Sequence, residues 1–392
     1  MFFMTKKVEV TRQVTFTILS MSLLTVMAGA AIAPALGIIK QHFSAAPDLL
    51  VQLIVSIPAL MIIVTSLFFR PISRRLHTRA IAILGLALYV ISGVGCSFVK
   101  EIGILLAMRA LLGVSVGLIM PLSTGLLAYY FPPSEMARLM GLSAAMNQMG
   151  GVVATLLAGL LATIEWNYAF LVYALGLLAL LMVLIWLPNE LLASHDKQGN
   201  PFKPAHLLKF HPSVTGMFLL MLIFFIFPTN FAIVASQQTT LSSHAITIIM
   251  VCLDVVAFFV GLGFGHLMHI FRRPIKYFAP LCFLIGYGLY LMAAVWAIIL
   301  GSAFIGIAAG VGVPYLNTIA SIKGGKTSAT TVMPLLSAAL YLGQFLSPVI
   351  VMPLARWIGG ITSPYMVGMA LSVVFLFQVW ATRHFQSLPP EK

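Results

Sequence analysis

Charged residues are scarce in this sequence, and that scarcity already narrows the class of protein. Only 8% of the 392 residues are Asp, Glu, Lys or Arg, and 61% are hydrophobic. A typical soluble domain has about 25% charged residues. Mean hydropathy is +1.06. The composition excludes an ordinary soluble enzyme, a disordered chain and a disulfide-stapled secreted domain, and it indicates an all-α membrane protein.

Cysteine and the common catalytic motifs are also nearly missing. The three cysteines, Cys96, Cys252 and Cys282, lie inside apolar runs without metal-ligand spacing, so we interpret them as buried small side chains. No nucleotide-binding loop, zinc-protease motif or nucleophile motif is present. We therefore expect no cofactor, no metal and no enzymatic activity, and we expect any transport to draw on an ion gradient or on the substrate's own gradient.

Long apolar runs dominate what is there. A membrane-spanning helix needs about 20 apolar residues. The sequence predicts twelve such helices, near residues 14–39, 50–69, 80–98, 102–130, 137–162, 167–187, 214–235, 245–268, 277–297, 299–321, 330–352 and 363–382.

The basic residues predict the orientation of these spans. If the N-terminus is cytoplasmic, eighteen of the 22 Lys and Arg residues fall in cytoplasmic segments, three fall outside, and Arg109 lies within a span. Such a bias follows the positive-inside rule. We expect both termini in the cytoplasm, a bacterial inner-membrane location and contact with the lipid bilayer. The net charge of +13 is then an orientation signal, and we expect no nucleic-acid partner.

The two halves of the chain repeat each other. The stretch from Gly113 to Pro121 matches that from Gly306 to Pro314, and Pro34 matches Pro228, at offsets of 193 and 194 residues. We predict an N-terminal six-helix bundle over residues 1–187, a cytoplasmic linker over 188–213 and a C-terminal six-helix bundle over 214–392. Parallel repeats of this kind place a substrate site near the membrane midplane, between the halves.

These features resemble the major facilitator superfamily, and in particular its twelve-span drug:proton antiporter branch. Arg109-Ala-Leu-Leu-Gly113 resembles the R-x-x-x-G of that family. Gly150 to Gly159 stands where the antiporters carry G-x-x-x-G-P-x-x-G-G, with Thr155 at the Pro position. The resemblance implies a role for Arg109 in proton coupling and a cavity lined by spans 4, 7 and 10.

The loop between spans 2 and 3 occupies the place of the family's cytoplasmic signature G-x-L-x-D-R-x-G-R-R. Its basic character is kept, but Ser73 stands at the acidic position and both glycines are replaced. The signature positions considered are Ser73, Arg74, Arg75 and Arg79.

Asp254 is the only carboxylate well inside a predicted span. An ionisable group at that depth is costly and is functional by default. Burial disfavours the charged carboxylate, which would let Asp254 exchange a proton near neutral pH; the alternative is a neutral Asp hydrogen-bonded within the bundle. Arg109 keeps its proton, so it either biases a nearby carboxylate or is a fixed structural charge. A pair between Arg109 and Asp254 would link protonation to alternating access.

Two further groups of residues are candidates for packing and for substrate contact. The small and proline residues permit close helix approach and bending; they are Gly113, Gly117, Pro121, Gly306, Gly310, Pro314, Gly150 and Gly159. The uncharged polar residues either join helices or face substrate; they are Asn230, Tyr315, Asn317, Asn147, Gln148 and Gln344.

We therefore predict a secondary active transporter that exports a small organic molecule in exchange for protons, acting as a monomer. A symporter or uniporter for a polar metabolite is an alternative, and so is a non-transporting receptor on the same scaffold. Gradient-driven flux separates the receptor from the transporters.

Overall fold

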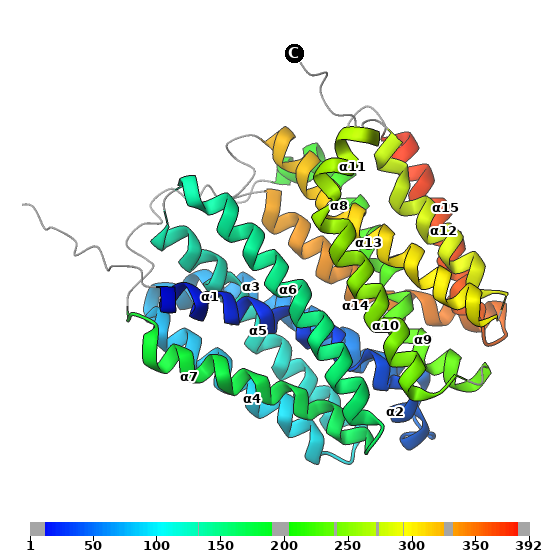
Figure 1. The fold of residues 1–392 in the computed structure, drawn as a ribbon, viewed down its shortest axis with the longest axis horizontal. Coiled ribbons are helices and arrows are strands. Elements are labelled where there is room, and N and C mark those ends of the chain that lie inside the picture. Colours follow the sequence, from blue (N-terminus) through cyan, green and yellow to red (C-terminus); the bar gives the residue numbers. More distant parts are fainter. Residues whose placement is uncertain are drawn as a thin grey trace, which may run out of the picture.

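The computed structural model describes residues 12–131, 133–189, 204–238, 241–271, 274–292, 294–324 and 332–382, and there the chain forms helices joined by short turns. Figure 1 shows two groups of helices, α1 to α7 and α8 to α15, packed side by side. The fold is the predicted all-α membrane architecture.

The N-terminal bundle has six membrane-length segments among the described residues, three of which combine shorter pieces. Its elements are α1 (Arg12–Ala30), η1 (Ala33–Ala35), α2 (Leu36–His42), α3 (Asp48–Arg75), α4 (Thr78–Gly95), η2 (Cys96–Phe98), α5 (Ile102–Tyr130), α6 (Pro133–Ala162), η3 (Trp166–Leu175) and α7 (Gly176–Trp186).

The C-terminal bundle repeats this arrangement. Its elements are α8 (Pro204–Phe224), α9 (Ile226–Gln238), α10 (Ser243–Leu262), α11 (Phe264–Phe271), η5 (Pro274–Tyr277), α12 (Phe278–Tyr290), α13 (Val295–Gly324), α14 (Met333–Ile358) and α15 (Ser363–Ala381). The end of the predicted linker, residues 204–213, is already helical, because α8 begins at Pro204; residues 190–203 lie outside the described part.

Eleven segments among the described residues are long and apolar enough to span a membrane. The predicted ninth segment is shorter than expected, because its helix ends at Tyr290 and α13 already begins at Val295. The four residues of η5 and the thirteen of α12 still extend about 28 Å at the usual rises per residue. The predicted boundary at residue 297 is therefore wrong by seven residues.

A proline interrupts the first helix of each bundle at equivalent places. α1 ends at Ala30, four residues before Pro34, and α8 ends at Phe224, four residues before Pro228. A proline ring clashes with the carbonyl group four residues earlier and provides no N–H for it. The two breaks are 194 residues apart, which is the offset that the sequence repeat predicts.

Glycines bring the equivalent helix pairs of the two bundles into close contact. A side-chain carbon at Gly306 or Gly310 would lie 2.7 Å from the carbonyl oxygen of Leu253 or Ala257, so α13 packs directly on the α10 backbone. In the N-terminal bundle, a side-chain carbon at Gly113 of α5 would lie even closer to the Pro58 carbonyl of α3. Small residues permit such contacts between membrane helices, and the structure places Gly113, Gly306 and Gly310 at them.

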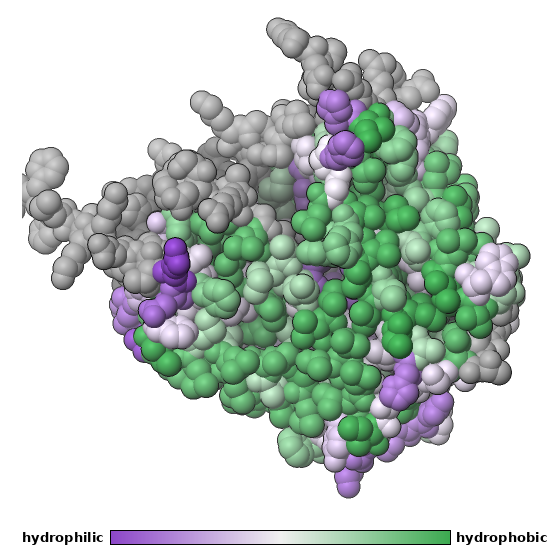
Figure 2. Space-filling model, viewed as in Figure 1, coloured by the Kyte–Doolittle hydropathy of each residue, from purple (hydrophilic) through white to green (hydrophobic). Residues whose placement is uncertain are grey.

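The surface suits a bilayer. Figure 2 shows an almost continuous apolar face, with the hydrophilic residues gathered toward its ends. Large apolar side chains that point outward include Leu181, Ile248 and Phe377, with 54%, 57% and 64% of their surface exposed. In water such a face would be unfavourable, but in hydrocarbon it satisfies the requirement for apolar contact.

Candidate functional site

The two bundles meet most tightly at one end of the molecule, which we call the Lys40 end because it carries Lys40. The opposite end, which carries Arg75, is called the Arg75 end. Near the Lys40 end α2 lies against α9, and α3 packs along α14. These contacts join the N-terminal to the C-terminal bundle.

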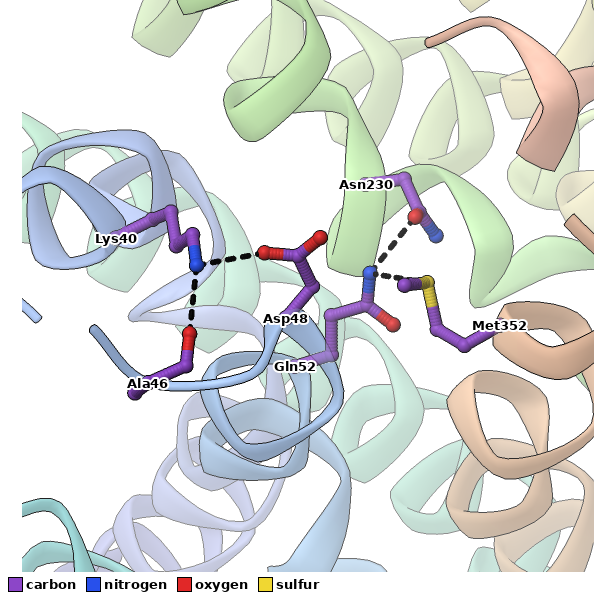
Figure 3. A network of polar contacts seen from close by, with 6 residues as sticks. All are labelled: Lys40, Ala46, Asp48, Gln52, Asn230 and Met352. Carbon is purple, nitrogen blue, oxygen red and sulfur yellow. Dashed lines mark hydrogen bonds and ion pairs between the residues drawn. The ribbon is translucent and has the colours of Figure 1, made fainter. Parts of the chain in front are cut away.

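A buried amide pair connects the bundles at the Lys40 end (Figure 3). The Gln52 side-chain nitrogen donates to the Asn230 amide oxygen at 2.8 Å and lies 3.1 Å from the Met352 sulfur. Gln52 and Asn230 are each 2% exposed. The Asn230 nitrogen donates to the Ile226 carbonyl, which fixes the orientation of both amides. Gln52 Oε1 has no hydrogen-bond partner among the residues that the structure describes.

An ion pair lies next to this amide pair and closer to solvent. Lys40 Nζ is 2.7 Å from Asp48 Oδ1 and also donates to the Ala46 carbonyl at 2.7 Å. The Asp48 side chain is 44% exposed. Asp48 and Gln52 border a cavity of about 260 Å³ that also receives Arg356 from α14. Polar residues from both bundles thus line the closed end.

Asp254 lies where α10 of the C-terminal bundle crosses α6 of the N-terminal bundle. The Thr155 hydroxyl donates to Asp254 Oδ2 at 3.2 Å. One turn nearer the Lys40 end, the Thr247 side chain of α10 packs against Gly159 of α6, where an added side-chain carbon would collide with it. Two turns nearer the Arg75 end on the same face of α6, Gln148 is exposed. α6 and α10 are therefore in contact from the Lys40 end to Asp254 and no longer cover each other at Gln148.

Two amide side chains lie over successive turns of one face of α1. Thr25 shares a 2.8 Å hydrogen bond with Asn147 of α6. Gln344 of α14 lies over Gly29, where a side-chain carbon would come within 2.8 Å of its amide nitrogen. Gln344 is 5% exposed, yet its amide makes no hydrogen bond to the residues that the structure describes. Both amides thus have hydrogen-bonding capacity left at the centre of the molecule.

Arg109 is fully buried inside the N-terminal bundle and holds three of its segments together. Its Nε donates to the Ile54 carbonyl at 2.6 Å, and its terminal nitrogens donate at 2.5 Å to the Ala28 carbonyl and the Tyr173 hydroxyl. The guanidinium also lies 5.6 Å from the Tyr173 ring centroid. Ala28 lies two residues before the end of α1 at Ala30, so Arg109 donates to a carbonyl group beside the helix break.

The structure does not bring Arg109 and Asp254 together. The hydrogen bonds that Arg109 makes to Ile54, Tyr173 and Ala28 all stay within the N-terminal bundle, whereas Asp254 bonds to Thr155 at the contact between bundles. The predicted pair is therefore absent from this conformation. The physical reason is that three oxygen acceptors already surround the planar guanidinium, which presents its donors in a fixed fork.

The remaining predicted polar residues fall in different places. Asn230 belongs to the closed Lys40 end rather than to the centre. Tyr315 is 4% exposed and borders a small space entirely within the C-terminal bundle, beside Leu220 and Ala279. Asn317 is partly buried on α13. Of the predicted cavity residues, only Asn147 and Gln344 approach the same face of α1.

The other glycine and proline candidates lie at helix contacts or inside continuous helices. Gly150 lies against the Leu23 carbonyl of α1, and Gly117 would place a side-chain carbon 2.6 Å from Thr65. Pro121 and Pro314 lie inside α5 and α13, which continue past them.

The predicted signature loop joins α3 to α4 at the Arg75 end. Arg79 donates a hydrogen bond to the Leu184 carbonyl of α7, and Thr78 donates to the Pro188 carbonyl at 3.1 Å. Ser73 is partly buried and Arg75 is exposed, while the Arg74 side chain lies outside the described part. This loop therefore anchors the end of α7.

Sequence reasoning did not single out Gln52, Thr25 or Tyr173. Gln52 and Thr25 interrupt apolar runs in the same way as Asn230 does, and that signal could have found them. Tyr173 gives no such signal, because tyrosine is common in apolar helices and its hydroxyl acquires a role only beside Arg109.

The fold and site together define a polytopic helical membrane protein with two pseudo-equivalent bundles and polar groups between them. The Major Facilitator Superfamily model matches residues 18–348, so the chain belongs to that superfamily and is a membrane transporter of its type.

Curated relatives match only part of their own length. The riboflavin transporter RibZ of Clostridioides difficile is 24% identical over 173 residues, covering 44% of this chain and 37% of RibZ. The uncharacterized MFS-type transporter YceJ of Bacillus subtilis is 26% identical over 218 residues, covering 54% of each chain. The matched region thus spans about half or less of these relatives.

Solved structures share the fold over almost the whole chain. A bacterial homolog of the human lysosomal transporter Spinster, in an inward-facing and occupied conformation, has a TM-score of 0.74 and 17% identity, with 96% and 98% of the two chains covered. The nucleoside transporter NupG has a TM-score of 0.74 and 11% identity, with 96% and 100% covered.

Proposed function

We propose that this protein is a monomeric secondary transporter of a bacterial inner membrane that exports a small organic molecule in exchange for protons. The observation that carries the proposal is the position of Asp254. It is a carboxyl group deep in a span, at the contact between the two bundles, and it accepts a hydrogen bond from Thr155 of the opposite bundle. Such groups in membrane helices commonly serve proton relays.

The arrangement of the bundles supports alternating access. The Lys40 end is closed by Gln52 and Asn230, while α6 and α10 separate beyond Asp254 toward the Arg75 end. Under the positive-inside rule the Arg75 end, with its basic loops, is cytoplasmic. Both termini then lie in the cytoplasm, and this conformation faces inward. In this proposal the two bundles rock about the contact between Asp254 and Thr155. A change in the protonation of Asp254 alters that contact.

Proton-coupled uptake of a polar metabolite is the second candidate. The amides Asn147 and Gln344 favour it, because they offer neutral hydrogen bonds rather than a cation site. RibZ carries the name of a riboflavin transporter, and another similar structure is of a D-xylose-proton symporter, so polar organic solutes suit this superfamily. Uptake and export differ in the direction in which the proton moves relative to the solute.

Everted vesicles with an imposed proton gradient test both candidates. Lumen pH is followed while single solutes are added to vesicles with the wild type, Asp254→Asn or the control Asp48→Asn, whose carboxylate lies at the Lys40 end. Export predicts that a solute dissipates the gradient in the wild type and the control but not in Asp254→Asn. Symport predicts a pH change of the opposite sign when solute enters with protons. Binding without any solute flux would instead indicate a receptor.

A further inference from the structure

The amides of Asn147 and Gln344 lie on opposite sides of the division between the two bundles. Asn147 comes from α6 and Gln344 from α14. Thr25 and Gly29, against which they lie, are four residues apart on α1. At the helical rise this separation is about 6 Å, so the two amides lie one helical turn apart.

Both amides have unused hydrogen-bonding capacity. The Thr25 hydroxyl donates to Asn147 Oδ1 and leaves the Asn147 amide nitrogen available as a donor. Gln344 makes no hydrogen bond to the part of the chain that the structure describes. Buried polar side chains normally have partners. Gly29 allows the Gln344 amide to lie this close to α1, because any side chain there would displace it.

Charge is missing from the immediate surroundings of these amides. Among the described helices, Arg109 and Asp254 are the charged side chains that lie away from the helix ends. Arg109 already donates to three oxygens, and Asp254 bonds to Thr155. Thr155 is eight residues from Asn147 along α6, which places it about 12 Å away at the helical rise. The nearest available groups are therefore neutral donors and acceptors.

We propose that the transported molecule is an uncharged polar solute that hydrogen-bonds to Asn147 and Gln344 at once. It carries a donor and an acceptor about one helical turn apart, and it links the N-terminal to the C-terminal bundle directly. This inference rests on the proposed transport function and names the substrate class for it. A lipophilic cation without hydrogen-bonding groups would gain no hydrogen bond from either amide.

Binding to the full chain in lipid nanodiscs tests the substrate class. The neutral probes are uridine, nicotinamide and xylose, and the charged probes are tetraphenylphosphonium and benzoate; each is added during thermal unfolding and in calorimetry. We expect at least one neutral probe to bind, and we expect Asn147→Leu and Gln344→Leu each to weaken it about tenfold or more, as for a hydrogen bond lost from a buried site. Asn147→Gln should recover part of the affinity, while Gln41→Leu, an exposed amide at the Lys40 end, should bind like the wild type.

Flux in proteoliposomes separates failure of the substrate class from failure of the transport function. Neutral probes that bind through both amides but show no flux would keep the substrate class and remove the transporter. Flux of tetraphenylphosphonium that Asn147→Leu and Gln344→Leu leave intact would keep the transporter and overturn the substrate class. If no neutral probe binds, or if binding survives both leucine variants, the inference is wrong.

Discussion

Gln52 and Asn230, 178 residues apart in the chain, share a 2.8 Å hydrogen bond that joins the two bundles at the Lys40 end. Both side chains are almost fully buried, so this contact lies in a region of low dielectric constant. A hydrogen bond is strong there, and losing one partner leaves the other group unsatisfied. The pair is therefore a principal polar contact of the closed end.

We expect Asn230→Leu to weaken closure of the Lys40 end, because Gln52 then loses its acceptor while its own Oε1 still has no partner. The reporter is Ala355→Cys, which lies in the adjoining cavity and is 3% exposed, with the three native cysteines replaced by alanine. A water-soluble maleimide should label it several-fold faster than in the parent. Asn167→Leu is the control, since the hydrogen bond of Asn167 goes to the Ser97 carbonyl of the same bundle. Equal labelling in both variants would contradict the role of the amide pair.

Lys40→Gln should have a much smaller effect on the same reporter. The ion pair with Asp48 is partly solvated, and such pairs contribute about 0–1 kcal/mol. We expect less than a twofold change in labelling rate, measured at low and at high salt. A change as large as that of Asn230→Leu would mean that the ion pair, and not the amide pair, holds the end closed.

Arg109→Met should destabilise the N-terminal bundle, because the Ala28 and Ile54 carbonyls and the Tyr173 hydroxyl lose their donor together. Each group left unsatisfied costs on the order of 1–3 kcal/mol. Arg109→Lys should recover only part of the stability, since an ammonium lacks the planar fork. Tyr173→Phe removes one of the three partners and should cost less. Thermal unfolding in detergent measures the order of stability of the three variants. A Tyr173→Phe variant less stable than Arg109→Met would contradict the prediction.

Gly113→Ala should separate α3 from α5, because the added carbon would collide with the backbone at Pro58. Gly125 lies on the same helix with no atom within 4 Å of an added carbon, so Gly125→Ala is the matched control. Alanine is favoured over glycine in helices by about 1 kcal/mol, so the control should be as stable as the parent or more so. Melting temperature and the yield of folded protein distinguish the two. Similar losses in both variants would mean that glycine flexibility, and not close packing, matters in α5.

Local chemistry explains what could be predicted from the sequence. Apolar runs must be about as long as the bilayer is thick, so most spans could be predicted. Pro34 and Pro228 interrupt their helices through local clashes, whatever the surrounding packing. The end of the ninth segment was misplaced, because Leu291 and Met292, which follow its helix, are as apolar as the helices beside them. Gly113 and Gly306 could be chosen as packing candidates, because small residues spaced along one helical face permit close helix approach.

Partners of the polar side chains could not be predicted in the same way. Asn230 and Asn317 look alike in the sequence, yet one bonds to Gln52 across the bundles and the other is only partly buried on α13. Arg109 and Asp254 both stand out as buried charges, but their partners, Tyr173 and Thr155, are 64 and 99 residues away. Nothing in either apolar run indicates those distances.

The sequence by itself determined the class of protein, the segments that cross the membrane, the repeat and the helix breaks, because each depends on the solvent or on neighbours within one or two turns. Only the tertiary structure decided that Gln52 and Asn230 close one end, that Arg109 holds the N-terminal bundle, and that Asn147 and Gln344 lie over one face of α1. Those facts depend on how each helix is rotated about its axis and on which distant helix it meets. Packing between the bundles sets both.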